Sequence, residues 1–284
     1  MIEVLIDDIG SFPLPDWISR EEFDRSYTFV REEISKGAKI EKDLEPFKNF
    51  YKAVKTSLDC KVSSGIDIVN YPQHYDMHKQ FMGPIIQFQE EPFLIQEKHA
   101  IMPELFVAER ESKRIFEESG KILQLKVCVT GALELHLKSE FGFYIYEEIL
   151  NNLAESVNRF LKNAILNTKY VKTAVVAIDE PSLGFVDLFN IEDEAIIKVL
   201  ARSVKDIPAK VQIHLHTLKS VGLPLQADGI EVITSEFAAS PENMNMITKK
   251  ELEDHDKSIR AGVTRTDYDA ILAEHLDKGI EPKH

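Results

Sequence analysis

The chain has few cysteines and no long apolar run, and each absence excludes a class of protein. Among its 284 residues only Cys60 and Cys128 are cysteines, too few for a disulfide framework and without the C-x-x-C spacing of a zinc ribbon or redox motif. No apolar run approaches the ~18 to 20 residues that a membrane span requires. The opening residues, MIEVLIDDIG, lack the features of a secretory signal. We therefore expect a cytoplasmic protein with no membrane partner.

Positive charge is also scarce. The 34 lysines and arginines stand against 48 acidic residues, for a formal charge of −14. Such a chain repels phosphate backbones, and no local basic cluster stands out to offset this, so we expect no nucleic-acid partner. The length allows a sizeable core and suits one α/β barrel, and no Gly/Ser-rich or Pro-rich linker divides the chain. We expect residues 1–284 to form a single domain.

Short β-branched runs alternate with helical patterns. The runs predict strands at 3–6, 66–70, 123–129, 173–178, 210–214, 229–234 and 258–263. The 3.6-residue period predicts helices at 20–35, 44–58, 103–119, 144–166, 193–203 and 266–276. Residues 83–99 are typical of a hairpin inserted between the second and third units. The alternation favours a parallel sheet and a TIM-type (β/α)8 barrel that lacks its last β/α unit.

Seven strands leave such a barrel open. A seven-stranded sheet cannot close with the usual eight-strand stagger, so its first and last strands would both present unpaired edges. Three explanations stay open: the natural protein continues beyond this sequence, a partner chain supplies the eighth strand, or residues 90–96, EEPFLIQ, fill the gap out of order.

Polar motifs follow the predicted strands. In chain order these are DDIGSFP, NYPQHYDM, VTGALELH, IDEPSLG, HLHTL, TSEFAASPEN and GVTRTDYD. The loops at the carboxyl ends of barrel strands build the active site, so we expect these motifs to meet at one mouth. A dinucleotide-binding fold is disfavoured because no strand is followed by G-x-G-x-x-G.

Three of these motifs carry candidate ligands. His214 and His216 share one face of a strand and can offer two nitrogen ligands to a metal, with Glu236 supplying an oxygen from the next loop. The alternative is a polar pair satisfied without metal. Asp179 and Glu180 point to opposite sides of their strand, so one of them can face the pocket while the other caps a turn.

Taken together, IGSFP, YPQHYDM, VTGALEL, IDEPSLG, HLHT and GVTRTD resemble the catalytic barrel of cobalamin-independent methionine synthase in its short, single-barrel form. The likeness follows chain order over nearly all of the sequence. It implies a methyltransferase that makes methionine by moving a methyl group to the sulfur of homocysteine, with zinc holding the thiol. A metal-bound thiol is deprotonated, and the thiolate is the nucleophile. The methyl donor, a folate or a methylcorrinoid, is left open.

The resemblance also implies roles for single residues. Ile9, Gly10 and Ser11 would contact the amino-acid part of homocysteine through backbone and hydroxyl groups. Asp179 would accept hydrogen bonds from its ammonium group. Asp267 is the best match to a family histidine that serves proton transfer, and it is the predicted catalytic residue.

The metal ligands implied by the resemblance are His216 and Glu236, with His214 as a third. The chain departs from the family pattern at three motifs: Leu218 stands where the family has a zinc cysteine, Tyr71 stands where it has an acidic residue, and Asp267 stands where it has the histidine. The family's last zinc cysteine lies on an eighth strand, which the pattern here does not provide. Two or three nitrogen and oxygen ligands can still hold zinc with water, or another metal.

Two further functions remain as alternatives. Missing zinc cysteines favour a non-catalytic or accessory barrel that pairs with an active relative. A decarboxylase related to the porphyrin-pathway enzymes would need arginines around an acidic substrate, and the strand-end loops offer only Arg265.

Overall fold

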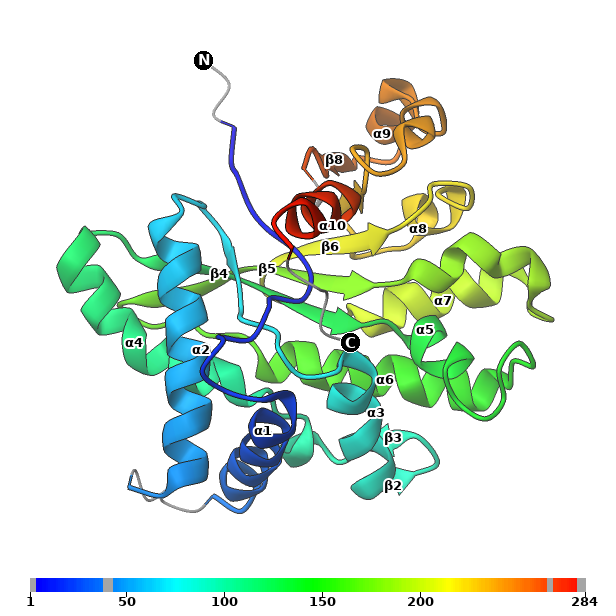
Figure 1. Cartoon of the computed structure of the whole chain (residues 1–284). Helices are drawn as coiled ribbons and strands as arrows, with labels where there is room; N and C mark the ends of the chain where they lie inside the picture. Colours follow the sequence, from blue (N-terminus) through cyan, green and yellow to red (C-terminus); the bar gives the residue numbers. More distant parts are fainter. Residues whose placement is uncertain (1–3, 38–42, 265–267, 280–284) are drawn as a thin grey trace.

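A computed structural model describes residues 4–37, 43–264 and 268–279 and contains one curled parallel sheet (Figure 1). Within these residues six strands pair in the order β1-β4-β5-β6-β7-β8. Their bounds are β1 Val69–Asn70, β4 Leu123–Thr130, β5 Val171–Asp179, β6 Lys210–Leu215, β7 Val232–Ser235 and β8 Ser258–Ala261. The sheet and its helices form a half-barrel, so the α/β class and the parallel sheet are confirmed, and the described residues do not form a complete (β/α)8 barrel.

The helices alternate with these strands. They are α1 Arg20–Ser35, α2 Glu45–Ser63, α3 Met77–Gln87, α4 Pro103–Ser119, α5 Ala132–Leu137, α6 Glu147–Asn163, α7 Asp193–Ser203, α8 Gly222–Gln226, α9 Lys249–Asp254 and α10 Tyr268–Asp277, with 3-10 turns η1 Glu97–His99, η2 Pro181–Leu188 and η3 Pro241–Asn245. The bounds of α1, α4 and α7 agree with the sequence-based prediction. In the described part of the chain, no helix combines the length and apolar character needed to cross a bilayer.

Local signals explain where the best-predicted helices begin and end. The Ser19 side chain caps α1 by accepting from the Glu22 amide, and Gly120 ends α4 with φ 71°. Helix α3 was missed because Gly83 and Pro84 lie inside it, and both residues are poor helix formers.

The predicted first strand is wrong in its extent. Of that range the structure describes residues 4–6, which form no strand, and one parallel bridge joins Asp7 to Ile68. The side chains of Val4, Leu5 and Ile6 are exposed. A strand is stabilised by packing on its faces and pairing on its edges, and this segment has pairing on one edge alone.

The predicted hairpin is correct in part. Strands β2 Gln89–Glu91 and β3 Leu94–Ile95 pair with each other in antiparallel fashion, whereas residues 83–87 belong to α3. The amide of Ile95 donates to Ser156 on α6, 2.9 Å away, which fixes the hairpin against that helix. Residues 90–96 therefore do not fill the gap in the sheet, and that explanation is wrong.

One polar row crosses five strands of the sheet. Paired in register from β4 to β8 are Thr130, Asp179, His214, Thr234 and Arg260. Paired residues of parallel strands direct their side chains to the same face. We call these five residues the inner row.

The inner row lines the concave side of the half-barrel. Asp7 forms ion pairs with both Lys126 on β4 and Arg260 on β8. Three strands separate β4 from β8 in the sheet, so side chains from both can meet one carboxylate only across the concave side. Lys126 shares its face of β4 with Thr130, four residues later. The row therefore faces the inside.

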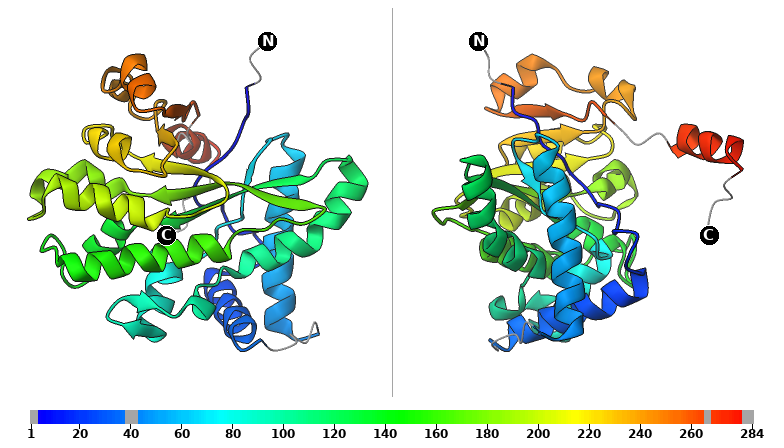
Figure 2. Two further views of the ribbon diagram at one scale, coloured as in Figure 1. Left: turned by 180° about the vertical axis from the view of Figure 1, so that it is seen from behind. Right: turned by 60° about the vertical axis from the view of Figure 1, so that its left-hand side comes forward.

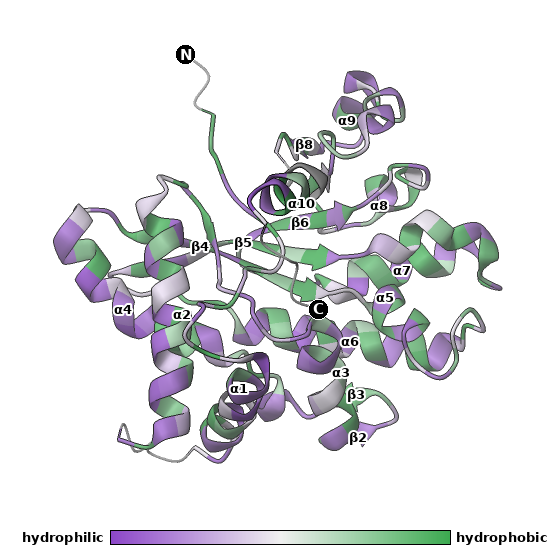
Figure 3. Ribbon diagram, in the orientation of Figure 1, coloured by the Kyte–Doolittle hydropathy of each residue, from purple (hydrophilic) through white to green (hydrophobic). Residues whose placement is uncertain are grey.

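The opposite face carries an apolar row. Each inner-row residue has a sequence neighbour in a second register row made of Val129, Ile178, Ile213, Ile233 and Ile259. The first four side chains of this outer row are fully buried, and Ile259 is 37% exposed. Seen from behind, α4 and α6 lie over this face (Figure 2). The central strands are correspondingly apolar, and the helices show polar stripes (Figure 3).

Candidate metal centre

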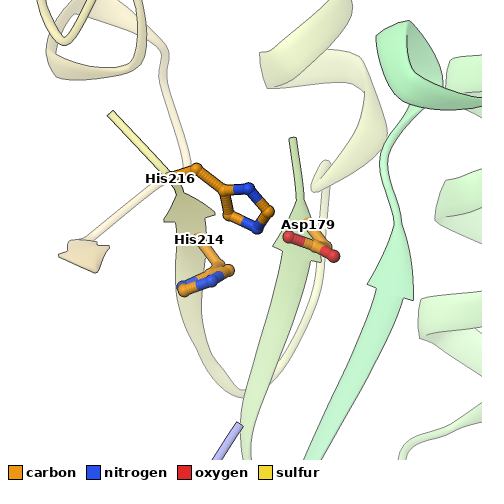
Figure 4. A group of neighbouring side chains, drawn as sticks. All are labelled: Asp179, His214 and His216. Atoms are coloured by element: carbon orange, nitrogen blue, oxygen red, sulfur yellow. The ribbon is translucent and has the colours of Figure 1, made fainter. Parts of the chain in front are cut away.

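Three potential ligands meet where β5 and β6 end. Asp179, His214 and His216 each offer one ligand atom, and these atoms all lie within 4.8 Å of one another (Figure 4). Asp179 and His214 are register partners on neighbouring strands. His216 follows two residues later, just after β6, and so stays on the same side. The structure thus brings together the H-x-H pair and the aspartate that the sequence pattern singled out.

The buried part of this cluster lacks hydrogen-bond partners. The side chain of His214 is 7% exposed, whereas that of His216 is 55% exposed. Among the described residues, neither Asp179 Oδ1 nor His214 Nδ1 has a partner. Leaving a buried polar group unsatisfied costs about 1–3 kcal/mol, so these atoms are suited to a ligand that restores their interactions.

Burial and the neighbouring charges act on Asp179 in opposite directions. Burial raises the pKa of Asp179 above its ordinary value, while His214 and His216 lower it and Glu236 raises it further. A carboxylate in this position gains from a nearby cation, because a positive charge favours its ionised form.

Glu236 completes the rim of the cluster. It follows β7, and its Oε1 lies 3.7 Å from His214 Nε2 and 3.9 Å from His216 Nε2. The first of these histidines holds the pKa of Glu236 below its ordinary value. Both distances exceed a hydrogen bond, so Glu236 lies close to both rings without bonding directly to either. The three predicted metal ligands are therefore neighbours, with Asp179 beside them.

Glu180 has a structural role instead. Its carboxylate accepts from the amides of Leu133 and Glu134, each at 3.0 Å, at the start of α5. A Cβ on Gly131 would stand 2.1 Å from the Glu180 carboxyl carbon, so only glycine fits there. Neighbouring residues of a strand point to opposite sides, and this pair does so. Asp179 faces the histidine cluster, and Glu180 caps α5.

Asn243 positions the loop that carries His216, and the sequence pattern did not reveal it. This fully buried side chain donates to the His216 carbonyl (3.1 Å) and to Ser235 Oγ (2.9 Å), and it accepts from the Leu218 amide (3.1 Å). It therefore ties the end of β6 to the end of β7. The motif SPEN that contains it was visible, but only its long-range contacts assign the role. Leu218 itself is buried in the core and offers no ligand atom.

More polar groups on the inner face were also missed. Among the described residues, Thr130 Oγ1, Thr234 Oγ1 and both amide atoms of Gln212 are buried without partners. Thr130 and Thr234 flank the cluster within the inner row, and Gln212 lies two residues before His214. A run of unsatisfied groups along one concave face is unusual in a structural core, and it extends the candidate site beyond the metal ligands.

The predicted substrate-binding loop lies beside β1. Asn70 Nδ2 donates to the Gly10 carbonyl (3.1 Å), and Gly10 has φ 94°, a conformation that suits glycine. Ser11 is exposed. No hydrogen bond among the described residues joins Ile9, Gly10 or Ser11 to the histidine cluster, so their predicted role stays a prediction. The predicted catalytic residue, Asp267, lies outside the described residues, as does Arg265.

No protein-family model matches the chain, and no curated protein matches it in sequence. The resemblance to methionine synthase therefore rests on the quoted motifs.

The donor set fits a divalent metal. Two imidazole nitrogens and one carboxylate oxygen, with a second carboxylate nearby, form a set that zinc, iron(II) and similar ions accept with coordination positions left open. A metal here would add a positive charge beside the buried Asp179 carboxylate, which favours its ionised form. Such a centre suits the binding and activation of a substrate rather than a purely structural role.

Proposed function

We propose that this chain is a metal-dependent enzyme that transfers a methyl group to the thiol of homocysteine. The observation that carries the proposal is the meeting of Asp179, His214 and His216 within 4.8 Å at the carboxyl ends of two barrel-type strands. Active sites of such sheets lie at this end. The methyl-transfer chemistry is drawn from the motif resemblance, and zinc is the metal that the resemblance implies.

Each residue then has a part in binding the thiol. A bound metal would supply a positive charge that favours the thiolate over the thiol. His214 and His216 would hold the metal through neutral ring nitrogens, with Glu236 beside them. Asp179 can either complete the ligand set or accept hydrogen bonds from the substrate ammonium group. The methyl donor, folate or methylcorrinoid, is open.

The first experiment measures metal content and homocysteine binding in the same variants. The purified chain should retain about one metal ion after dialysis, and the double variant His214→Ala, His216→Ala should lose it, because the carboxylates of Asp179 and Glu236 alone bind zinc weakly. The control is His255→Ala, which removes an exposed histidine at the C-terminal end of α9. Metal retained at the wild-type level in the double variant would remove this site from consideration.

Asp179→Asn separates the two roles of Asp179. Loss of metal assigns the carboxylate to the ligand set. Metal retained with homocysteine binding weakened by about tenfold or more, seen by calorimetry, assigns it to the ammonium group, because an unpaired buried charge typically costs more than ~1.4 kcal/mol. Unchanged metal and unchanged homocysteine binding would contradict both roles.

An accessory role is the second candidate, and the open edge of the sheet favours it. A half-barrel whose edge β8 is unpaired within the described residues can serve as a subunit of an active relative. Methyl transfer by the isolated chain at the rate of a complete enzyme would exclude this candidate.

A further inference from the structure

The outer edge of β8 presents free backbone groups. The amides of Ser258 and Gly262 donate to carbonyl oxygens on the β7 side, each at 2.9 Å. Alternate residues of a strand direct their backbone groups to opposite sides, so Ile259 and Ala261 direct theirs away from β7. Within the described residues β8 has no second neighbour. The edge therefore offers a short ladder of donors and acceptors.

A second free margin faces the same opening. The carbonyl of Ile6 accepts from the amides of Asp67 (2.9 Å) and Ile68 (3.2 Å), so Ile6 directs its backbone toward β1. By the same alternation, Leu5 and Asp7 direct their backbone groups to the other side. Two parallel chain segments thus present unpaired backbone on either side of the opening.

Apolar surface lines the opening. Leu5 is 54% exposed on one margin and Ile259 is 37% exposed on the other. A cavity of about 660 Å³ lies at the amino-terminal ends of the strands and is lined by Leu5, Ile68, Leu123, Val175 and Arg260, among others. Exposed apolar edge strands are sites at which another chain can pair.

The charge inside the opening is unbalanced. Asp7 is the single carboxylate that pairs with both Lys126 and Arg260. Lys126 is 1% exposed, and burial lowers its pKa to about 8, which leaves it cationic at neutral pH. Two cations share the one carboxylate of Asp7, and the other carboxylate that acts on Lys126, Asp8, is already paired with Lys61. These five side chains therefore carry one net positive charge, which a further carboxylate would balance.

We propose that the opening between β8 and residues 4–7 binds an extended strand of another polypeptide, parallel to β8, with apolar side chains outward and one carboxylate directed toward Lys126 and Arg260. Within the described residues no other strand can take this place, because β2 and β3 pair only with each other. The strand would complete the outer row beyond Ile259. This inference is independent of the metal centre.

Amide hydrogen exchange of the full chain tests the proposal with two synthetic peptides. Each has about eight residues, a usual strand length, with valines at alternate positions, and they differ only by a central Asp or Lys. We expect the Asp peptide to slow exchange at Ile259, Ala261, Leu5 and Asp7 by about tenfold or more, as new ladder bonds form, and the Lys peptide to have no effect. The amides of Ser258 and Gly262, already bonded to β7, serve as internal controls.

Two variants check the geometry and the charge separately. Ile259→Pro removes an edge amide that β7 does not use and should abolish binding of the Asp peptide, whereas Ile259→Val should retain it. Arg260→Met removes the excess charge and should erase the preference for Asp over Lys even if Ile259→Pro fails to fold. Equal binding of both peptides to the wild-type chain, or binding of neither, would overturn the proposal. So would a concentration-dependent dimer in which these amides are already protected, because a second copy would then be the occupant.

Discussion

The two faces of the central sheet are built from neighbouring residues and have opposite properties. The outer row, exemplified by Ile178 and Ile213, is apolar and packed. The inner row, exemplified by Asp179 and His214, is polar, and several of its buried atoms lack partners among the described residues. A one-residue step along a strand therefore separates the groups that stabilise the fold from those suited to bind a ligand. Natural proteins accept such local costs mainly at functional sites.

The largest effect should come from the outer face. Ile213→Ala removes three carbons from a fully buried side chain on a central strand and should cost about 3–4 kcal/mol of unfolding free energy. Ile259→Ala, in the same row but 37% exposed, should cost less than about 1 kcal/mol. Urea denaturation of both variants provides the measurement. Equal losses would mean that the margin of the sheet is as well packed as its centre.

The next largest loss of stability should come from the contact between Gly131 and Glu180. Gly131→Ala would place a Cβ 2.1 Å from the carboxyl carbon of Glu180 and displace that side chain from the α5 amides. We expect a loss of about 2–3 kcal/mol, since the buried Leu133 amide and the partly buried Glu134 amide both lose their acceptor. Gly222→Ala is the matched control, because a Cβ there meets nothing within 4 Å. Thermal denaturation distinguishes them, and similar melting temperatures would show that Glu180 can move without loss.

The smallest effect should have the opposite sign. Gln212 is fully buried on the inner face, and neither amide atom has a partner among the described residues. Gln212→Leu keeps the approximate volume and removes the unsatisfied groups, so stability should rise by about 1 kcal/mol. If Gln212→Leu lowers stability instead, the Gln212 amide has hydrogen-bond partners in the native protein. The contrast between the polar inner face and the apolar outer face would then not hold at this residue.

The fold was predictable wherever burial follows a local period. The ranges of α1, α4 and α7 and the central strands β4, β5 and β6 came close to the observed bounds. The prediction failed where local signals mislead: residues 4–6 have β-branched composition without a face to pack, and α3 contains Gly83 and Pro84. Composition cannot report whether a neighbouring element will cover a segment.

For the candidate site, the sequence by itself determined which chemical groups stand at the strand ends: the H-x-H pair, the Asp-Glu pair and Glu236. Alternation along a strand even required Asp179 and Glu180 to separate. Only the tertiary structure decided that Asp179 faces His214, that Glu180 caps α5, and that Asn243 ties the His216 loop to β7. The physical reason is that side-chain period is a local property of the chain, whereas strand register and hydrogen-bond partnership join residues far apart in sequence.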